Sequence, residues 1–444
     1  MKFKIVIIMG VCLSYVAVAN AQSRQWSLEN CIDYGLSHHI SLKVQENAVK
    51  IAEQKARETL SAYLPQVVSS INLDDNLKRQ ASIIPAGYIG PDAVAVRFGT
   101  HYSSIANGTI DQVVYDQSML TGLKAGRYQV RQAQLSGEVN KEIVTYNIET
   151  GYYQVFIYKQ QSELLLENKK NYDRQLAVIE LRVNKGIAVQ ADLERMQVTL
   201  NNTLSQVNLA QSNYEVALGN LKNFMGLQPE DSLAIKPIDV AKVTDVPAVG
   251  ASSFQVTNRN DYQLQQVAIS LAGIEERRIR QTGLPRLTAY GRYSDQAQGD
   301  QLSTYTRNWG DFSTIGLKLS VSVFDGFKRN AQYKQALYNK MNAEETLLQD
   351  AHDFTTAYNN SEIALTKARA NLESDLENLE LSKSVLATST LQYQGGTAVL
   401  SDWLNSTISQ NDAQRNYLTS LYNYLMARLD LEKAKGNLLD YSKN

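Results

Sequence analysis

The sequence contains little proline and little cysteine, and it carries almost no net charge. Seven prolines in 444 residues leave room for long uninterrupted helices, because proline removes a helical hydrogen bond. A net charge of −1 provides no electrostatic reason to expect nucleic acid as a partner. Of the two cysteines, Cys12 lies in the apolar N-terminal segment, so Cys31 is left without an intramolecular disulfide partner.

Sequence patterns typical of catalysis and of cofactor binding are also missing. His38 and His39 are adjacent, and no glycine-rich phosphate loop follows an expected strand. Together with Cys31 these histidines could suggest a metal site, but their side chains would diverge on a helix. We therefore predict that the chain is not an enzyme and that it has no cofactor and no metal.

The first 21 residues have the three parts of a secretory signal peptide. Lys2 and Lys4 precede an apolar segment at 5–18, and Ala19-Asn20-Ala21 forms a cleavage site. Elsewhere no stretch approaches the roughly 18 apolar residues of a transmembrane helix. The sequence predicts an exported protein that no helix anchors.

The rest of the chain is an internal duplication. LRVNKGIAVQADL at 181–193 matches LQYQGGTAVLSDW at 391–403. Leu64-Pro65 recurs as Leu284-Pro285, and VVYD ending at Asp116 recurs as SVFD ending at Asp325. Three landmarks in the same order indicate two copies of one structural unit.

Each copy is expected to hold a helix, two strands and a long helical hairpin. The first helix runs from Leu28, capped by Ser27, to about residue 62, and its counterpart spans about 261–282. A loop rich in glycine and proline separates the first pair of strands. In the last strand, Ile315, Leu317 and Leu319 alternate with polar or small residues, which is the period of a strand with one apolar face. We expect the four strands at about 64–76, 104–116, 286–294 and 312–324.

Two proline-free stretches, 117–185 and 326–395, predict helices roughly 100 Å long at ~1.5 Å per residue. Apolar residues spaced by seven favour coiled-coil packing over an ordinary bundle, although polar Gln410 interrupts one seam. The seams are Leu365, Leu372, Leu379, Leu386 and Tyr393; Leu193, Leu200, Val207, Tyr214 and Leu221; and Trp403, Gln410, Tyr417, Tyr424 and Leu431.

The matching segments form the hairpin tips. Gly186 and Gly396 supply the backbone conformation that ends each ascending helix. Asp192 and Asp402 then fall at the start of the descending helices, where a carboxylate suits the helix dipole. Capping alone or a functional role would explain both aspartates equally well.

Four amphipathic strands are long enough to cross a bilayer but cannot close a barrel. Two chains would supply eight strands and three would supply 12, which could leave a pore. The polar faces, with Lys318, Arg286 and Arg292, would then line water. The alternative is a non-channel periplasmic coiled-coil adaptor or scaffold, which leaves the alternating strands unexplained.

The chain resembles the TolC-like outer membrane efflux protein family in its duplicated halves, its order of helix, LP, strands and helix, and its tips with six residues from glycine to aspartate. The resemblance implies a mainly α fold with a membrane β part, in which a homotrimer forms a 12-stranded outer-membrane β-barrel and a periplasmic α-barrel. It further implies a passive exit duct of a tripartite efflux or type I secretion system in a Gram-negative outer membrane. Its partners would be a periplasmic adaptor, an inner-membrane pump of RND or ABC type and outer-membrane lipid, with no nucleic acid.

The same resemblance assigns a periplasmic gate to the tips. Asp402 would form an acidic ring and Asp192 would join a network between hairpins. The chain departs from the family's pattern at Ala398, where a basic residue is expected, and at Asn405, where an acid is expected. We therefore expect a less charged gate, latched through Trp403 and Tyr393. The expected adaptor contacts are Asn184, Lys185, Gly186, Ile187, Ala188 and Val189 in copy one, and Gln394, Gly395, Gly396, Thr397, Ala398 and Val399 in copy two.

The expected layout is a signal peptide at 1–21, a first repeat at 22–225, a connector at 226–258 and a second repeat at 259–444. The transported substrate stays open between drugs, metals and polypeptides.

Overall fold

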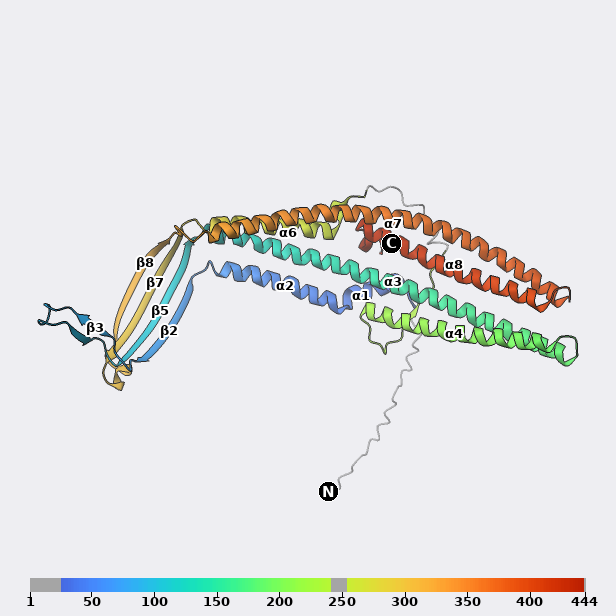
Figure 1. The fold of residues 1–444 in the computed structure, drawn as a ribbon, viewed down its shortest axis with the longest axis horizontal. Helices are drawn as coiled ribbons and strands as arrows, with labels where there is room; N and C mark the ends of the chain where they lie inside the picture. The colour runs from blue at the N-terminus through green and yellow to red at the C-terminus, as the bar shows by residue number, and fades with distance from the viewer. Residues whose placement is uncertain (1–24, 241–253, 443–444) are drawn as a thin grey trace, which may run out of the picture.

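The computed structural model describes residues 25–240 and 254–442, so the predicted signal peptide lies outside the described residues. The described chain is elongated, with a curved sheet at one end and two long helical hairpins that end together at the other (Figure 1). This arrangement separates a β part from a much longer α part, as the sequence predicts.

The β part is a four-stranded antiparallel sheet in the order β2-β5-β7-β8. Copy one supplies the first two strands and copy two the last two, and the copies meet at the β5–β7 pair. The strands are β2 (Gln66–Asp75), β5 (Tyr102–Tyr115), β7 (Arg286–Gly299) and β8 (Gly310–Ser320). Within residues 25–240 and 254–442, neither β2 nor β8 has a second neighbour, so both outer strands of the sheet are open edges.

The register sorts polar and apolar side chains onto opposite faces. On one face Thr288 pairs with Lys318, and the pairs Arg286–Ser320 and Arg292–Thr314 lie on the same face. On the other face Ala289 pairs with Leu317, which is 71% exposed. The single chain therefore presents an apolar sheet face that nothing in the described residues covers.

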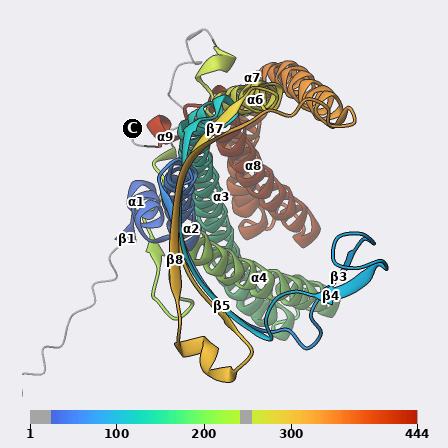
Figure 2. The same cartoon turned by 90° about the vertical axis from the view of Figure 1, so that its left-hand side faces the viewer.

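Three features of the β part differ from the sequence expectations. Strand β7 runs to Gly299 rather than to about residue 294, because it stays paired with β5 up to that residue. The loop between β2 and β5 contains a short hairpin, β3 (Ala81–Ile84) and β4 (Val94–Arg97), which projects beyond the far end of the sheet on its concave side (Figure 2). Strand β8 ends at Ser320 rather than at residue 324, because the chain leaves the ladder and turns at 325–327 to enter the next helix.

The helical hairpins have the predicted length and position. The ascending helices are α3 (Gln117–Asn184), with 68 residues, and α7 (Lys328–Gln394), with 67. The descending helices, α4 (Gln190–Met225) and α8 (Leu400–Lys435), have 36 residues each. At ~1.5 Å per residue α3 is roughly 100 Å long. The heptad seams lie inside, with Leu372 and Leu379 buried in α7 and Val207 and Leu221 buried in α4.

Shorter helices pack beside the part of each ascending helix that is nearer to the sheet. The expected single helix at 28–62 is wrong: α1 (Leu28–His38) and α2 (Ile40–Ser61) are separated by extended backbone at His39. The end of α4 packs against this break, and a Cβ on Gly226 would lie 3.2 Å from the Cα of His39. Ser27 caps α1 as expected, accepting the Asn30 N–H at 3.2 Å.

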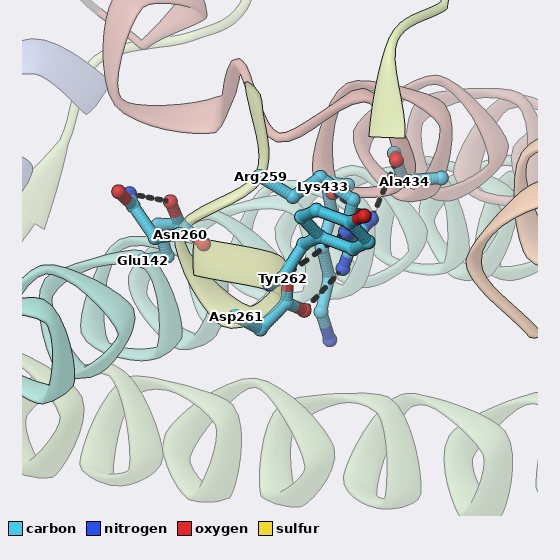
Figure 3. A network of polar contacts seen from close by, with 7 residues as sticks. All are labelled: Glu142, Arg259, Asn260, Asp261, Tyr262, Lys433 and Ala434. Carbon is cyan, nitrogen blue, oxygen red and sulfur yellow. Dashed lines mark hydrogen bonds and ion pairs between the residues drawn. The ribbon is translucent and has the colours of Figure 1, made fainter. Parts of the chain in front are cut away.

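In copy two, α6 (Asn260–Gln281) begins where α8 ends, and Arg259 joins the two (Figure 3). Its guanidinium donates to the carbonyls of Lys433 (3.2 Å) and Ala434 (2.5 Å) in the last turn of α8, where carbonyls lack the full set of helical partners. It also pairs with Asp261 at 2.6 Å. The junction thus gains charge-assisted hydrogen bonds at the point where the connector enters the second copy.

The main core lies at this level, where both hairpins meet α1 and the C-terminal helix α9 (Leu438–Tyr441). Ile148, Tyr152, Leu221 and Leu425 are almost fully buried there. The connector adds η1 (Val256–Asn258) and β6 (Ala234–Ile235), which pairs in parallel with β1 (Gln25–Trp26). Within the described residues, no helix is both long enough and apolar enough to cross a membrane.

Candidate functional site at the hairpin tips

The two tips are the same turn made twice. In the first, the N–H of Ile187 donates to the carbonyl of Arg182 (2.8 Å), and Gly186 has a φ of 72°. In the second, the N–H of Thr397 donates to the carbonyl of Gln392 (2.9 Å), and Gly396 has a φ of 76°. Both follow the Schellman pattern, in which a left-handed residue satisfies the last carbonyls of a helix.

Asp192 and Asp402 lie in the first turn of the descending helices, as predicted. Neither is the cap, because the N-cap residues are Val189 and Val399, which offer no side-chain acceptor. The carboxylate of Asp402 is exposed, whereas Asp192 is half-buried. The helix dipole favours both positions, but capping does not account for either aspartate.

Just above the turns, a tip cluster joins the two hairpins. Trp403 is 4% exposed, and its ring lies against Tyr393 (centroids 6.1 Å apart) and Tyr172 (6.2 Å). Its indole N–H donates to the hydroxyl of Thr390 at 3.1 Å. The tip cluster consists of Tyr172, Ile179, Met196, Tyr393, Leu400, Trp403 and Leu404, and it draws on α3, α4, α7 and α8.

Tyr393 also meets charged groups of the first hairpin. The guanidinium of Arg182 lies 5.2 Å from the centre of its ring. Burial raises the pKa of the Tyr393 hydroxyl, the nearby Asp192 carboxylate raises it further, and Arg182 opposes both. The structure thus brings Asp192 and Tyr393, predicted separately at the gate, into one neighbourhood between hairpins.

The remaining tip residues lie on the surface. Asn405 is exposed on α8, one helical position beyond the tip cluster. Ile187 is 72% exposed, Val189 62% and Val399 61%, so each tip ends in apolar side chains that are mostly exposed. Ala188 and Ala398 are half-buried, while the glycines and the polar members of both tips are exposed.

Sequence reasoning missed an amide network higher on the seam between the hairpins. The side-chain amide of Asn168 in α3 donates to Asn411 (2.7 Å) and Gln414 (3.3 Å) in α8. Asn411 in turn donates to the hydroxyl of Tyr172 at 3.0 Å. A groove of about 380 Å³ lies beside this network, between α4 and α8. No spacing in the sequence marks these residues, because their pairing depends on the register of α3 against α8.

Known proteins with similar sequences are outer membrane proteins. A family model described as "Outer membrane efflux protein" matches residues 236–437, which hold the second copy with its strands and tip. Outer membrane protein TolC of Salmonella enteritidis is 24% identical over 347 residues, covering 74% of this chain and 68% of the relative. TolC of Vibrio cholerae serotype O1 is 22% identical over 412 residues, covering 90% and 87%.

The chain is similar to the TolC-like outer membrane efflux proteins. Its fold is also that of the outer membrane channel CmeC of Campylobacter jejuni, with a TM-score of 0.75 at 16% identity and coverage of 93% and 86%. The chain is located in the outer membrane of a Gram-negative bacterium and extends into the periplasm. It is not an enzyme. In the described residues, no group of three or more His, Cys, Asp or Glu side chains is placed to hold a metal ion.

Proposed function

We propose that three copies of the chain form the outer-membrane exit duct of a tripartite efflux or type I secretion system. The observation that carries this proposal is the sheet with two open edges and one uncovered apolar face. Open edges are not tolerated in lipid, so β8 of one copy pairs with β2 of the next. Three sheets of four strands then close as a 12-stranded barrel, whose polar face surrounds water.

The helical hairpins continue this tube through the periplasm. The duct conducts substrates passively from an inner-membrane pump of RND or ABC type, through a periplasmic adaptor. The exposed apolar residues at the tips, Ile187, Val189 and Val399, support adaptor contact there. Exposed apolar side chains that lie together are typical of surfaces that bind a partner.

The tips also form the gate in this proposal. Asp402 is exposed at the entrance of the second hairpin, where three copies place three carboxylates around the axis. Tyr393 and Trp403 hold that hairpin against the first through the tip cluster, beside Arg182 and Asp192. The latch is therefore largely aromatic, with a single cation–π contact adding about 0.5–2 kcal/mol.

Two measurements test the duct and its gate. We expect a heat-modifiable trimer in outer-membrane fractions and a cation-blocked current in planar bilayers. Asp402→Ala is expected to weaken the block, whereas Asp412→Ala is not, because Asp412 is already paired with Arg415 at 2.8 Å. A periplasmic monomer without conductance would instead favour an adaptor or scaffold. Equal block of the current by cations in both variants would show that Asp402 is not part of the gate.

The adaptor assignment has its own test. Ile187→Ala and Val399→Ala are expected to reduce crosslinking to the adaptor and to reduce efflux, while the trimer stays intact. Unchanged crosslinking and efflux would show that the adaptor binds elsewhere.

A further inference from the structure

The two copies differ most clearly where the sheet joins the long helices. In copy one, β5 ends at Tyr115, and Asp116 caps α3 directly by accepting the Met119 N–H at 3.1 Å. In copy two, seven residues, 321–327, separate the end of β8 from the start of α7. We call this segment the β8–α7 junction; it lies at the helix end of the sheet in Figure 1.

Large apolar side chains of the β8–α7 junction are exposed. Val323 is 90% exposed, Phe324 75% and Phe327 72%. The rings of Phe324 and Phe327 meet edge to face, with centroids 5.6 Å apart. Phe327 has a φ of 65°, a left-handed conformation that is rare for a bulky side chain and often marks a functional segment.

Positive charge accompanies these rings. A cavity of about 570 Å³ is lined by Phe324 and Phe327 together with Arg280 from α6 and Arg329 from α7. Across the described ranges neither guanidinium has a carboxylate within 4 Å, unlike that of Arg286 at the start of β7, which lies 3.8 Å from Asp116 of copy one. The one acid of the cavity, Asp325, accepts the Arg329 backbone N–H at 3.2 Å. The N-terminus of the 67-residue helix α7 adds a further site for negative charge.

We propose that the β8–α7 junction binds the phosphate head group of a glycerophospholipid in the periplasm-facing leaflet. Arg280 and Arg329 contact the phosphate, and Phe324 and Phe327 lie among the acyl chains. This rests on the proposed barrel, in which the apolar face of β8, with Ile315 and Leu317, points to lipid. That face leads directly into the junction, so head-group and acyl-chain contacts are continuous.

A second copy of the chain is the competing occupant. In the closed barrel the neighbouring copy pairs with the hydrogen-bonding edge of β8, but it does not cover the strand's outward face. The two unpaired guanidinium groups favour the anionic phosphate, since arginine binds phosphate through paired N–H donors.

Lipid titration of the purified, delipidated trimer, followed by native mass spectrometry, tests the proposal. Dioleoylphosphatidylglycerol is expected to bind saturably, at up to one molecule per copy. Arg280→Ala with Arg329→Ala should weaken its binding on the order of tenfold per arginine. The control pair, Arg174→Ala with Arg195→Ala, removes two exposed arginines far from the junction and should change nothing.

Control ligands and a further variant test which chemical groups of the lipid are recognised. Dioleoylglycerol, which lacks the phosphate, should bind weakly and equally to all variants. Phe327→Gly relieves the left-handed backbone while it removes one ring, so weaker lipid binding by this variant cannot be attributed to misfolding. Inorganic phosphate that competes as effectively as the lipid would overturn the proposal in favour of a free-anion site.

Two other results would also overturn the lipid site: unchanged lipid binding by the double arginine variant, or a disulfide between Phe324→Cys and Leu64→Cys of neighbouring copies. The same preparations report on the duct separately. Failure of the unmodified protein to form a conducting trimer contradicts the proposed function, whereas a conducting trimer with unchanged lipid binding contradicts only the lipid site.

Discussion

Replacing Trp403 with alanine is expected to loosen the hairpin tips while the rest of the bundle stays folded. The side chain is 4% exposed, contacts two tyrosine rings and donates one hydrogen bond to Thr390. Truncation of a buried tryptophan costs about 3–5 kcal/mol. At ~1.4 kcal/mol per tenfold, this raises the population of locally open tips by about two to four orders of magnitude.

Hydrogen–deuterium exchange of peptides covering residues 386–411 measures this opening. Leu391→Ala is the matched control, because Leu391 is 70% exposed at the same tip and its truncation should cost less than about 0.5 kcal/mol. The core around Ile148 should keep its protection in both variants. If Trp403→Ala exchanges no faster than Leu391→Ala, the tip cluster does not hold the hairpins together.

Three further predictions concern stability, each measured by urea unfolding. Arg259→Ala is expected to cost about 1.5–3 kcal/mol, because two α8 carbonyls lose a charged donor; a loss under about 0.5 kcal/mol would contradict the junction's role. Gly396→Ala is expected to cost about 1 kcal/mol, because its φ of 76° disfavours a Cβ, while Gly395→Ala, at a φ of −74°, should cost little; equal costs would refute the turn assignment. Burial raises the pKa of the Glu149 carboxyl from 4.5 to about 7. Because the pKa of Glu149 is higher in the folded state than in the unfolded state, this group stabilises the fold fully below about pH 4.5, and the stabilisation is lost as the pH rises through about 7. Glu149→Gln should therefore reduce the fall in unfolding free energy between these two pH values. An unchanged dependence on pH would show that Glu149 does not cause this fall.

Local signals were enough to predict the hairpin tips. Gly186 and Gly396 adopt a left-handed conformation that few other residues accept, so the turn is encoded within a few residues. The absence of proline was likewise enough to predict α3 and α7, since nothing within either stretch stops a helix.

The features that the sequence does not predict depend on tertiary contacts. No proline or glycine lies at His39, and the break there packs against Gly226, which is distant in the sequence. The sequence predicts only a loop where β3 and β4 pair, since these strands are short and flank a turn rich in glycine and proline between Ile84 and Val94.

The tip cluster was predictable only in part. Heptad spacing identified Tyr393 and Trp403 as seam residues, and both are buried. The approach of Arg182 and Asp192 to Tyr393 depends on how one hairpin lies against the other. That register is a property of the assembled bundle, and no spacing within either copy specifies it.

Electron cryomicroscopy of the purified protein in lipid nanodiscs tests the central claim most directly. The account predicts threefold symmetry, with β8 of each copy hydrogen-bonded to β2 of the next in a 12-stranded barrel around a continuous tube. A monomer with an open four-stranded sheet, or an assembly in which β2 and β8 of neighbouring copies do not pair, would contradict it.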